Sequence, residues 1–206
     1  IIAITGGLAS QWKNVRFTFT EANMLPDDHP VNVEYKHFLK KFGEEGNLIL
    51  MALDDEKIYT PEVLNKWIAL SNELKQFKQI DAVISINNLP ILVKDTAQQR
   101  FVTHKFIEGE VKTQAQADNL QQILSEKLPF YEGLIYNKKN NTLQTAVYMN
   151  KKIVNTQARK DFILNDFIPI VKKFKQQTGL KVHTSGMPYI RTLRVGPSRP
   201  GSLPWP

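Results

Sequence analysis

The feature that most constrains the fold of this chain is a regular alternation of short apolar runs with amphipathic segments. Residues 47–55 (NLILMALDD) form a continuous apolar run closed by acids, which is typical of a strand buried on both faces. Thr60, Pro61 and Glu62 then provide a strong start for a helix, and residues 80–86 (IDAVISI) predict the next strand. This alternation predicts an α+β fold built from packed layers of helix and sheet.

The second half of the chain repeats the alternation with one more strand. Residues 100–107 and 180–186 are interpreted as strands, and residues 133–150 as a β-hairpin with a polar turn. Thr113 and Gln116 predict a capping box at the start of one helix. A second helix is expected from Asn155 or Thr156 to Gly179, with a kink at Pro169, which removes the hydrogen bond to the carbonyl of Asn165.

The resulting order, β-α-β-β-α-β, matches the ferredoxin-like split βαβ pattern. The first half, β-α-β-α-β, resembles an incomplete copy of it. We therefore expect two ferredoxin-like subdomains, each an α/β two-layer sandwich, at residues 10–98 and 99–193. Residues 87–99 (NNLPILVKDTAQQ) are interpreted as a linker, and residues 194–206 as a disordered or non-native tail, because they are dense in Pro and Gly and have no period.

The decapeptide EANMLPDDHP, residues 21–30, predicts a corner between a strand and a helix. Residues 15–20 (VRFTFT) alternate like a strand, and Asp27 or Asp28 is suited to cap a helix whose first turn tolerates Pro30. The following residues place apolar side chains at helical spacing: Val31, Tyr35, Phe38 and Phe42.

Composition narrows the classes of protein to consider. The hydrophobic content of 42% and the charged content of 23% are those of a globular protein, and the absence of Cys excludes disulfides and thiolate chemistry. The net charge of +7 is carried by Lys residues spread along the predicted helices, which favours solvated helix faces over a nucleic-acid patch. No run approaches the ~20 apolar residues that span a bilayer.

The polar residues predict no catalytic, metal or cofactor site. The four His residues lack the spacing of a helical zinc pair, and the paired acids fall at the ends of predicted elements. An RNA-recognition domain shares the βαββαβ order, but the third strand of the unit lacks its aromatic and glycine signature. A cleft between two α/β layers, suited to an apolar ligand, would be lined by Trp67, Phe77, Phe130, Tyr131 and Tyr136.

Residues 23–53 (NMLPDDHPVNVEYKHFLKKFGEEGNLILMAL) resemble the start of the first periplasmic loop of RND-superfamily exporters, in the MMPL or hydrophobe-exporter branch related to Patched-like proteins. Such loops begin with a strand, then a Leu-Pro-acid corner, a helix ending in Phe-Gly and an apolar strand. Residues 60–89 are similar to the following helix and strand, and residues 184–193 (TSGMPYIRTL) resemble the stretch that leads into the second membrane helix.

This resemblance implies a porter domain, with no enzymatic activity and no cofactor, on the periplasmic side of a bacterial inner membrane. It implies proton-driven export of lipids or other hydrophobic molecules through a cleft between α/β subdomains. The implied partners are the transmembrane helices and the second periplasmic domain of the same transporter, and the resemblance allows a homo-oligomer but no nucleic acid. The alternative is a free-standing ferredoxin-like module that binds RNA or an acidic partner.

Overall fold

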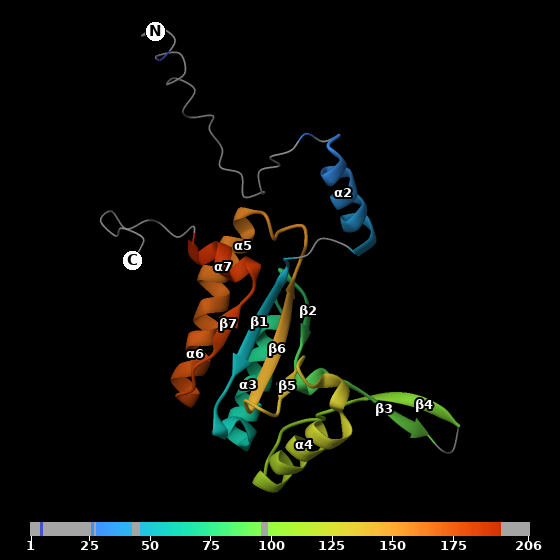
Figure 1. Ribbon diagram of the computed structural model, residues 1–206. Helices are drawn as coiled ribbons and strands as arrows, with labels where there is room; N and C mark the ends of the chain where they lie inside the picture. Colours follow the sequence, from blue (N-terminus) through green and yellow to red (C-terminus); the bar gives the residue numbers. More distant parts are fainter. Residues whose placement is uncertain (1–4, 6–25, 27, 43–45, 96–98, 195–206) are drawn as a thin grey trace.

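A computed structural model describes residue 5, residue 26 and residues 28–42, 46–95 and 99–194 (Figure 1). Predicted features outside these residues include the strand at 15–20, Asp27, and the tail beyond residue 194. The helices are α2 (Pro30–Phe42), α3 (Pro61–Lys75), α4 (Gln114–Lys127), α5 (Gln157–Phe162), α6 (Ile168–Thr178) and α7 (Met187–Arg194). The strands are β1 (Leu48–Leu53), β2 (Ile80–Ile84), β3 (Pro90–Asp95), β4 (Arg100–Lys105), β5 (Tyr136–Asn137), β6 (Thr142–Met149) and β7 (His183–Ser185).

The fold is α+β, as the sequence predicts, with a five-stranded antiparallel sheet at its centre. The strand order is β2-β6-β1-β7, and β5 adds to β6. Along the chain, β1-α3-β2 and β6-α6-β7 are two βαβ segments that share one sheet. Strand β6 lies between β1 and β2, and β1 lies between β6 and β7, which is the split βαβ arrangement. Figure 1 shows α3 behind this sheet and α6 along its β7 edge, and the two helices contact each other.

The sheet crosses the predicted boundary between residues 10–98 and 99–193. β1 and β2 precede that boundary and β5, β6 and β7 follow it, so the βαββαβ unit is assembled from both halves of the chain instead of from the second half alone. The physical reason is that strand pairing is decided by packing against distant segments, which local periodicity does not encode.

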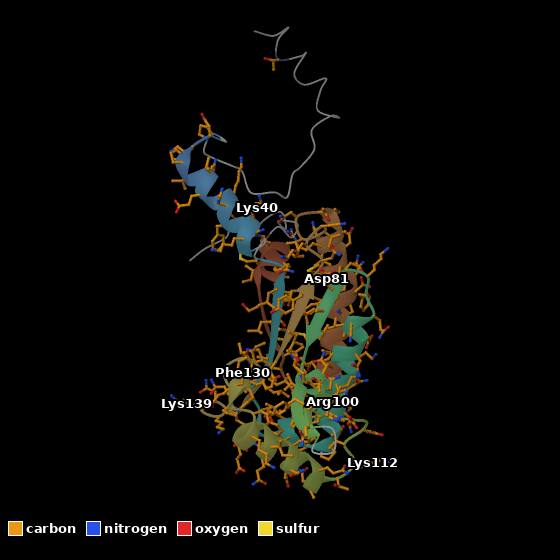
Figure 2. All side chains as sticks on the ribbon, turned by 90° about the vertical axis from the view of Figure 1, so that its right-hand side faces the viewer. Lys40, Asp81, Arg100, Lys112, Phe130 and Lys139 are labelled. Atoms are coloured by element: carbon orange, nitrogen blue, oxygen red, sulfur yellow. The ribbon has the colours of Figure 1, made fainter. Side chains whose placement is uncertain are left out.

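The core lies between the sheet and the two helices α3 and α6. Residues of β1 alternate between buried and partly exposed positions, and Met51 and its neighbours on the inner face are fully buried. The ring of Trp67 on α3 meets Phe174 on α6 edge to face, with centroids 5.4 Å apart. Seen a quarter turn away, in Figure 2, both helices lie on the same side of the sheet.

A line of buried hydroxyls ties α3 to the inner face of the sheet. The Ser71 Oγ lies 2.9 Å from the Trp67 carbonyl oxygen and 3.0 Å from the Ser85 Oγ, and Ser85 and Thr145 share a hydrogen bond of 2.7 Å. These polar groups are tolerated in the core because each of them has a partner.

Residues 90–95, interpreted above as a linker, form β3 and pair with β4 in a separate two-stranded sheet. The hairpin projects away from the main sheet in Figure 1, and the residues of β4 are mostly exposed. Pro90 obscured the strand in the sequence because Pro is rare inside central strands, whereas here it begins an edge strand.

The structure tests two predictions about the helices. The capping box of Thr113 and Gln116 is present at α4. Where a kink was predicted at Pro169, the structure has a π-helical turn, η5 (Ile163–Phe167), in which the N–H of Ile168 bonds to the carbonyl of Ile163. The π turn lets the helix continue past a residue that has no N–H to donate.

At the corner before α2, the N–H of Val31 donates to Nδ1 of His29 at 3.3 Å, so the imidazole takes part in capping the helix. Of the two acids predicted to cap it, Asp27 lies outside the described residues. The predicted apolar stripe of α2 is exposed in this structure: Val31 is 56% exposed, Tyr35 55% and Phe38 42%.

Within residues 28–42, 46–95 and 99–194, no helix combines the length and the apolar character needed to cross a bilayer.

Candidate functional site

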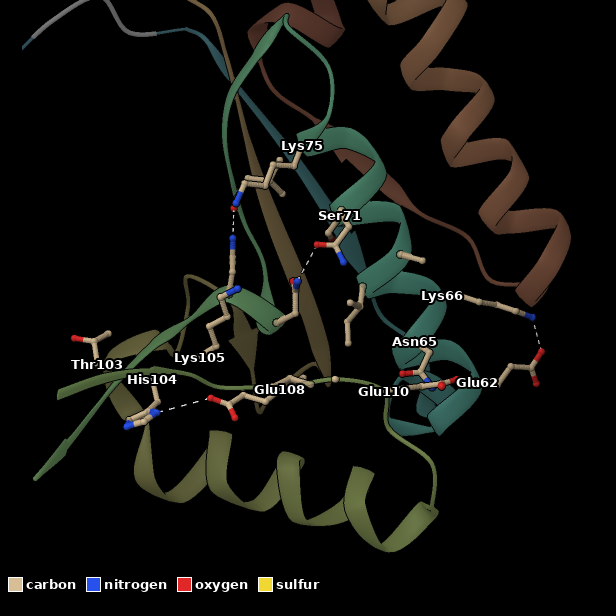
Figure 3. A pocket seen from close by; sticks show the side chains of 18 residues that line it. Glu62, Asn65, Lys66, Ser71, Lys75, Thr103, His104, Lys105, Glu108 and Glu110 are labelled. Carbon is tan, nitrogen blue, oxygen red and sulfur yellow. Dashed lines mark hydrogen bonds and ion pairs between the residues drawn. The ribbon is translucent and has the colours of Figure 1, made fainter. Parts of the chain in front are cut away.

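A cleft of about 1160 Å³ lies between α3 and the end of β4 with the segment that follows it (Figure 3). One wall is the outer face of α3, and the other is formed by residues 103–110. The end of β2 and the short 3-10 turn η3 (Ile86–Asn88) close the cleft at its base. A volume of this size exceeds what most small-molecule sites require.

The α3 wall exists because the helix is amphipathic. Residues such as Val63 and Trp67 face the core, and the residues between them at helical spacing face the cleft. Glu62 lies in the first turn and Lys75 in the last, which separates them by ~20 Å along the axis at 1.5 Å per residue. The wall therefore has an acid near one end and a base at the other.

The opposite wall is held against α3 by one side chain. Asn65 donates from Nδ2 to the Val111 carbonyl at 2.7 Å and accepts the Val111 N–H at Oδ1 at 2.9 Å. The amide thus satisfies both backbone groups of a residue that is only 4% exposed. Phe106 N–H also donates to the Leu89 carbonyl at 3.0 Å, which anchors the base of the hairpin.

The charges of the cleft are arranged in local pairs. Lys66 donates to Glu62 and, at 2.9 Å, to the Gln177 carbonyl at the end of α6. The hydrogen bond from Lys66, together with its positive charge, lowers the pKa of the Glu62 carboxyl below its usual value. His104 Nδ1 lies 3.8 Å from Glu108 Oε1 on the opposite wall.

The floor of the cleft is less polar than its rim. Val83 and Ile107 are buried, and Ile68 on α3 is partly buried beside them. Asn87 at the base donates to Asn72 at 3.2 Å. An apolar floor with amide and charged groups around it is suited to reversible binding of an extended ligand, in which hydrogen bonds fix orientation and the floor takes apolar groups.

A second surface lies on the outer face of the sheet. Leu50 pairs with Ala146, and Ala146 pairs in turn with Ile84, which is 40% exposed. Leu48 pairs with Tyr148 on the same face. We call these five residues the bare face, because they lie on the side of the sheet opposite the buried core; Leu48, Leu50, Ala146 and Tyr148 are partly exposed there.

The five aromatic residues predicted to line one cleft are not gathered at one place. Trp67 is fully buried in the core, and Phe77 packs edge to face on Phe162 at 5.3 Å. Tyr136 is buried in β5, and its hydroxyl donates to the Leu128 carbonyl. Phe130 is 78% exposed and contacts Tyr131, whose hydroxyl donates to the Pro90 carbonyl at 2.9 Å.

Sequence reasoning missed both surfaces, for different reasons. The cleft is lined mainly by polar residues of α3 and of the loop after β4, and such residues carry the same pattern as any solvated face. The sequence did contain a sign of the bare face, because every residue from 48 to 53 is apolar. That continuous run predicts a strand covered on both faces, whereas the described residues bury one face of β1 and leave the other partly exposed.

In the described part of the chain, no group of three or more His, Asp or Glu residues lies close enough together to hold a metal ion. Comparison of the sequence with protein-family models gives no match, and comparison with curated proteins gives no significant match.

Proposed function

We propose that this chain is the periplasmic porter domain of an RND-type exporter in a bacterial inner membrane, and that its bare face contacts hydrophobic or lipid cargo. The observation that carries the proposal is the composition of that face. Antiparallel sheets with one solvated face usually place polar residues outward, as Gln144, His183 and Ser185 are here, but Leu48, Leu50, Ala146 and Ile84 form an apolar stretch on the same face. A contiguous apolar surface of this kind is typical of a binding or interaction site.

The course of the chain supports insertion between two membrane segments. Leu50 of β1 pairs antiparallel with Ser185 of β7, so the chain enters β1 and leaves β7 at the same end of the sheet. α7 follows directly and contacts both strands, and α2 lies toward the same end in Figure 1. A domain whose entry and exit coincide can be carried by two neighbouring membrane helices.

One observation favours a different class of function, recognition of single-stranded RNA. The central strands β1 and β6 carry the bare face, as the central strands do in RNA-recognition domains, and Tyr148 is an aromatic side chain on it. The remaining members of the bare face are aliphatic, which offers no further stacking platform. Two titrations of the same purified protein, described next, distinguish the two functions.

The test is a titration of the purified chain with N-phenyl-1-naphthylamine, a hydrophobic fluorophore. We expect a saturable rise in fluorescence that Ile84→Glu weakens severalfold, because it places a charge on the bare face at a position already exposed. The matched control is Phe101→Glu, which adds the same charge at a 68% exposed position on the hairpin. Equal binding by Ile84→Glu and the parent chain would refute the role of this face.

A parallel titration with a fluorescent oligouridylate tests the RNA alternative. RNA binding that weakens steeply with salt, without binding of the fluorophore, would replace the exporter proposal. The gene provides a separate check, because an RND exporter requires membrane-spanning segments encoded on both sides of this domain.

A further inference from the structure

The two edges of the β3–β4 hairpin differ, although no further described strand pairs with either of them: a side chain binds a backbone carbonyl at the β3 edge, and that strand begins with a proline. Tyr131 binds the Pro90 carbonyl at the start of β3, and Pro90 has no N–H to offer a neighbouring strand. Among the described strands, β4 pairs with β3 alone. An unpaired strand edge presents a row of N–H and C=O groups that can pair with another strand.

The hydrogen bonds at the base of the hairpin show which backbone groups point outward. In an antiparallel pair, successive residues alternate between facing the partner strand and facing away. Phe106 N–H donates to the Leu89 carbonyl, so the groups of His104 and Val102 also face β3. The N–H and C=O groups of Phe101, Thr103 and Lys105 therefore point to the outer edge.

The side chains along this edge are basic. Arg100 and Lys105 are exposed and place positive charge on the two faces of the strand, and His104 lies between them, 3.8 Å from Glu108. A second copy of β4 pairing along the same edge would bring like charges together, which is unfavourable. Basic residues on an edge thus disfavour self-association and favour a strand with acidic side chains.

From these observations we propose that the outer edge of β4 is a docking site for an extended, acidic segment of a partner polypeptide, which adds to the hairpin as a third strand. Backbone groups of Phe101, Thr103 and Lys105 supply the ladder, and the cations select acidic side chains. The 68% exposed ring of Phe101 offers an apolar contact. A third strand also stabilises the hairpin, because two strands alone are marginal in water. The proposal does not depend on the exporter function.

The test uses a fluorescein-labelled peptide, Glu-Val-Glu-Val-Thr-Val-Glu, and measures its anisotropy with the full chain. We expect saturable binding, with no binding of the matched peptide in which Lys replaces Glu. Thr103→Pro removes an outward N–H that β3 does not use, so the fold is retained while affinity falls by about tenfold or more. Lys105→Glu also weakens binding, whereas Lys139→Glu, at an exposed site in the β5–β6 turn, does not.

Hydrogen exchange provides a readout that does not rely on variants. In the free chain, we expect the amides of Thr103 and Lys105 to exchange quickly and those of Val102 and His104 to exchange slowly. The acidic peptide should slow the exchange of Thr103 and Lys105. The proposal is overturned if the acidic peptide fails to bind, if Thr103→Pro binds it as the parent does, or if the exchange of Thr103 and Lys105 is unchanged in its presence. Binding of the Lys peptide with equal affinity also overturns it.

Discussion

Gly186 occupies the junction between β7 and α7, and its replacement by Ala tests how tightly this junction packs on β1. Its φ of +114° lies in a region that L-residues rarely adopt. A Cβ built there would lie 2.2 Å from the carbonyl oxygen of Leu48 and 2.9 Å from Cα of Ile49. Both neighbours are backbone atoms, so no side-chain rotation can relieve the contact.

The expected cost has two parts. The backbone conformation costs about 1–2 kcal/mol for a residue with a Cβ. Moving the oxygen from 2.2 Å to beyond 3.0 Å shifts the junction by nearly 1 Å against β1, and overpacking of this kind costs about 1–3 kcal/mol. We therefore expect Gly186→Ala to lower the free energy of unfolding by about 2–5 kcal/mol, a large share of the stability of a typical domain.

Urea denaturation followed by circular dichroism measures this loss. The matched control is Gly179→Ala, because Gly179 has a φ of +74° and a Cβ there would meet nothing within 4 Å. Any change in the entropy of the unfolded chain is common to both variants and cancels in their difference. If Gly186→Ala were no more destabilising than Gly179→Ala, the close approach of β7 to β1 would be refuted.

Two further predictions concern buried groups. Burial raises the pKa of the Tyr59 phenol to about 12, with a smaller contribution from Tyr136, against about 10 in the unfolded chain, so the folded state holds this proton more tightly. The contribution of this proton to the free energy of unfolding is fully present below about pH 10 and falls by about 2–3 kcal/mol as the pH rises toward 12. Urea denaturation midpoints at about pH 10 and about pH 12, for the parent chain and for Tyr59→Phe, measure this loss. Asn65→Ala leaves the buried N–H and C=O of Val111 unpaired and should cost about 2–4 kcal/mol, with faster exchange of the Val111 amide. Asn72→Ala, on an exposed turn of the same helix, should leave that amide unchanged.

Local chemistry determined most of the elements of this fold in advance. Thr113 and Gln116 define a helix start through bonds within four residues, and the stripe of α3 follows from the period of the helix. Pro169 likewise marks an interruption whose cause lies within one turn. These features depend on neighbours in sequence, so they can be predicted from sequence.

The pairing of these elements was decided by the tertiary structure. The strand at 100–105 has the pattern of a sheet member, yet its partner is β3, and the place beside β1 belongs to β6. In the sequence, Trp67 and Tyr136 could not be distinguished from residues that contact a ligand, but in the structure both are buried in the core. Strand partners and cleft walls depend on contacts between distant segments, whose free energies are settled only when the whole chain packs. For that reason the sequence by itself determined the elements and the α+β class, and only the tertiary structure decided the single split sheet, its bare face and the unpaired edge of β4.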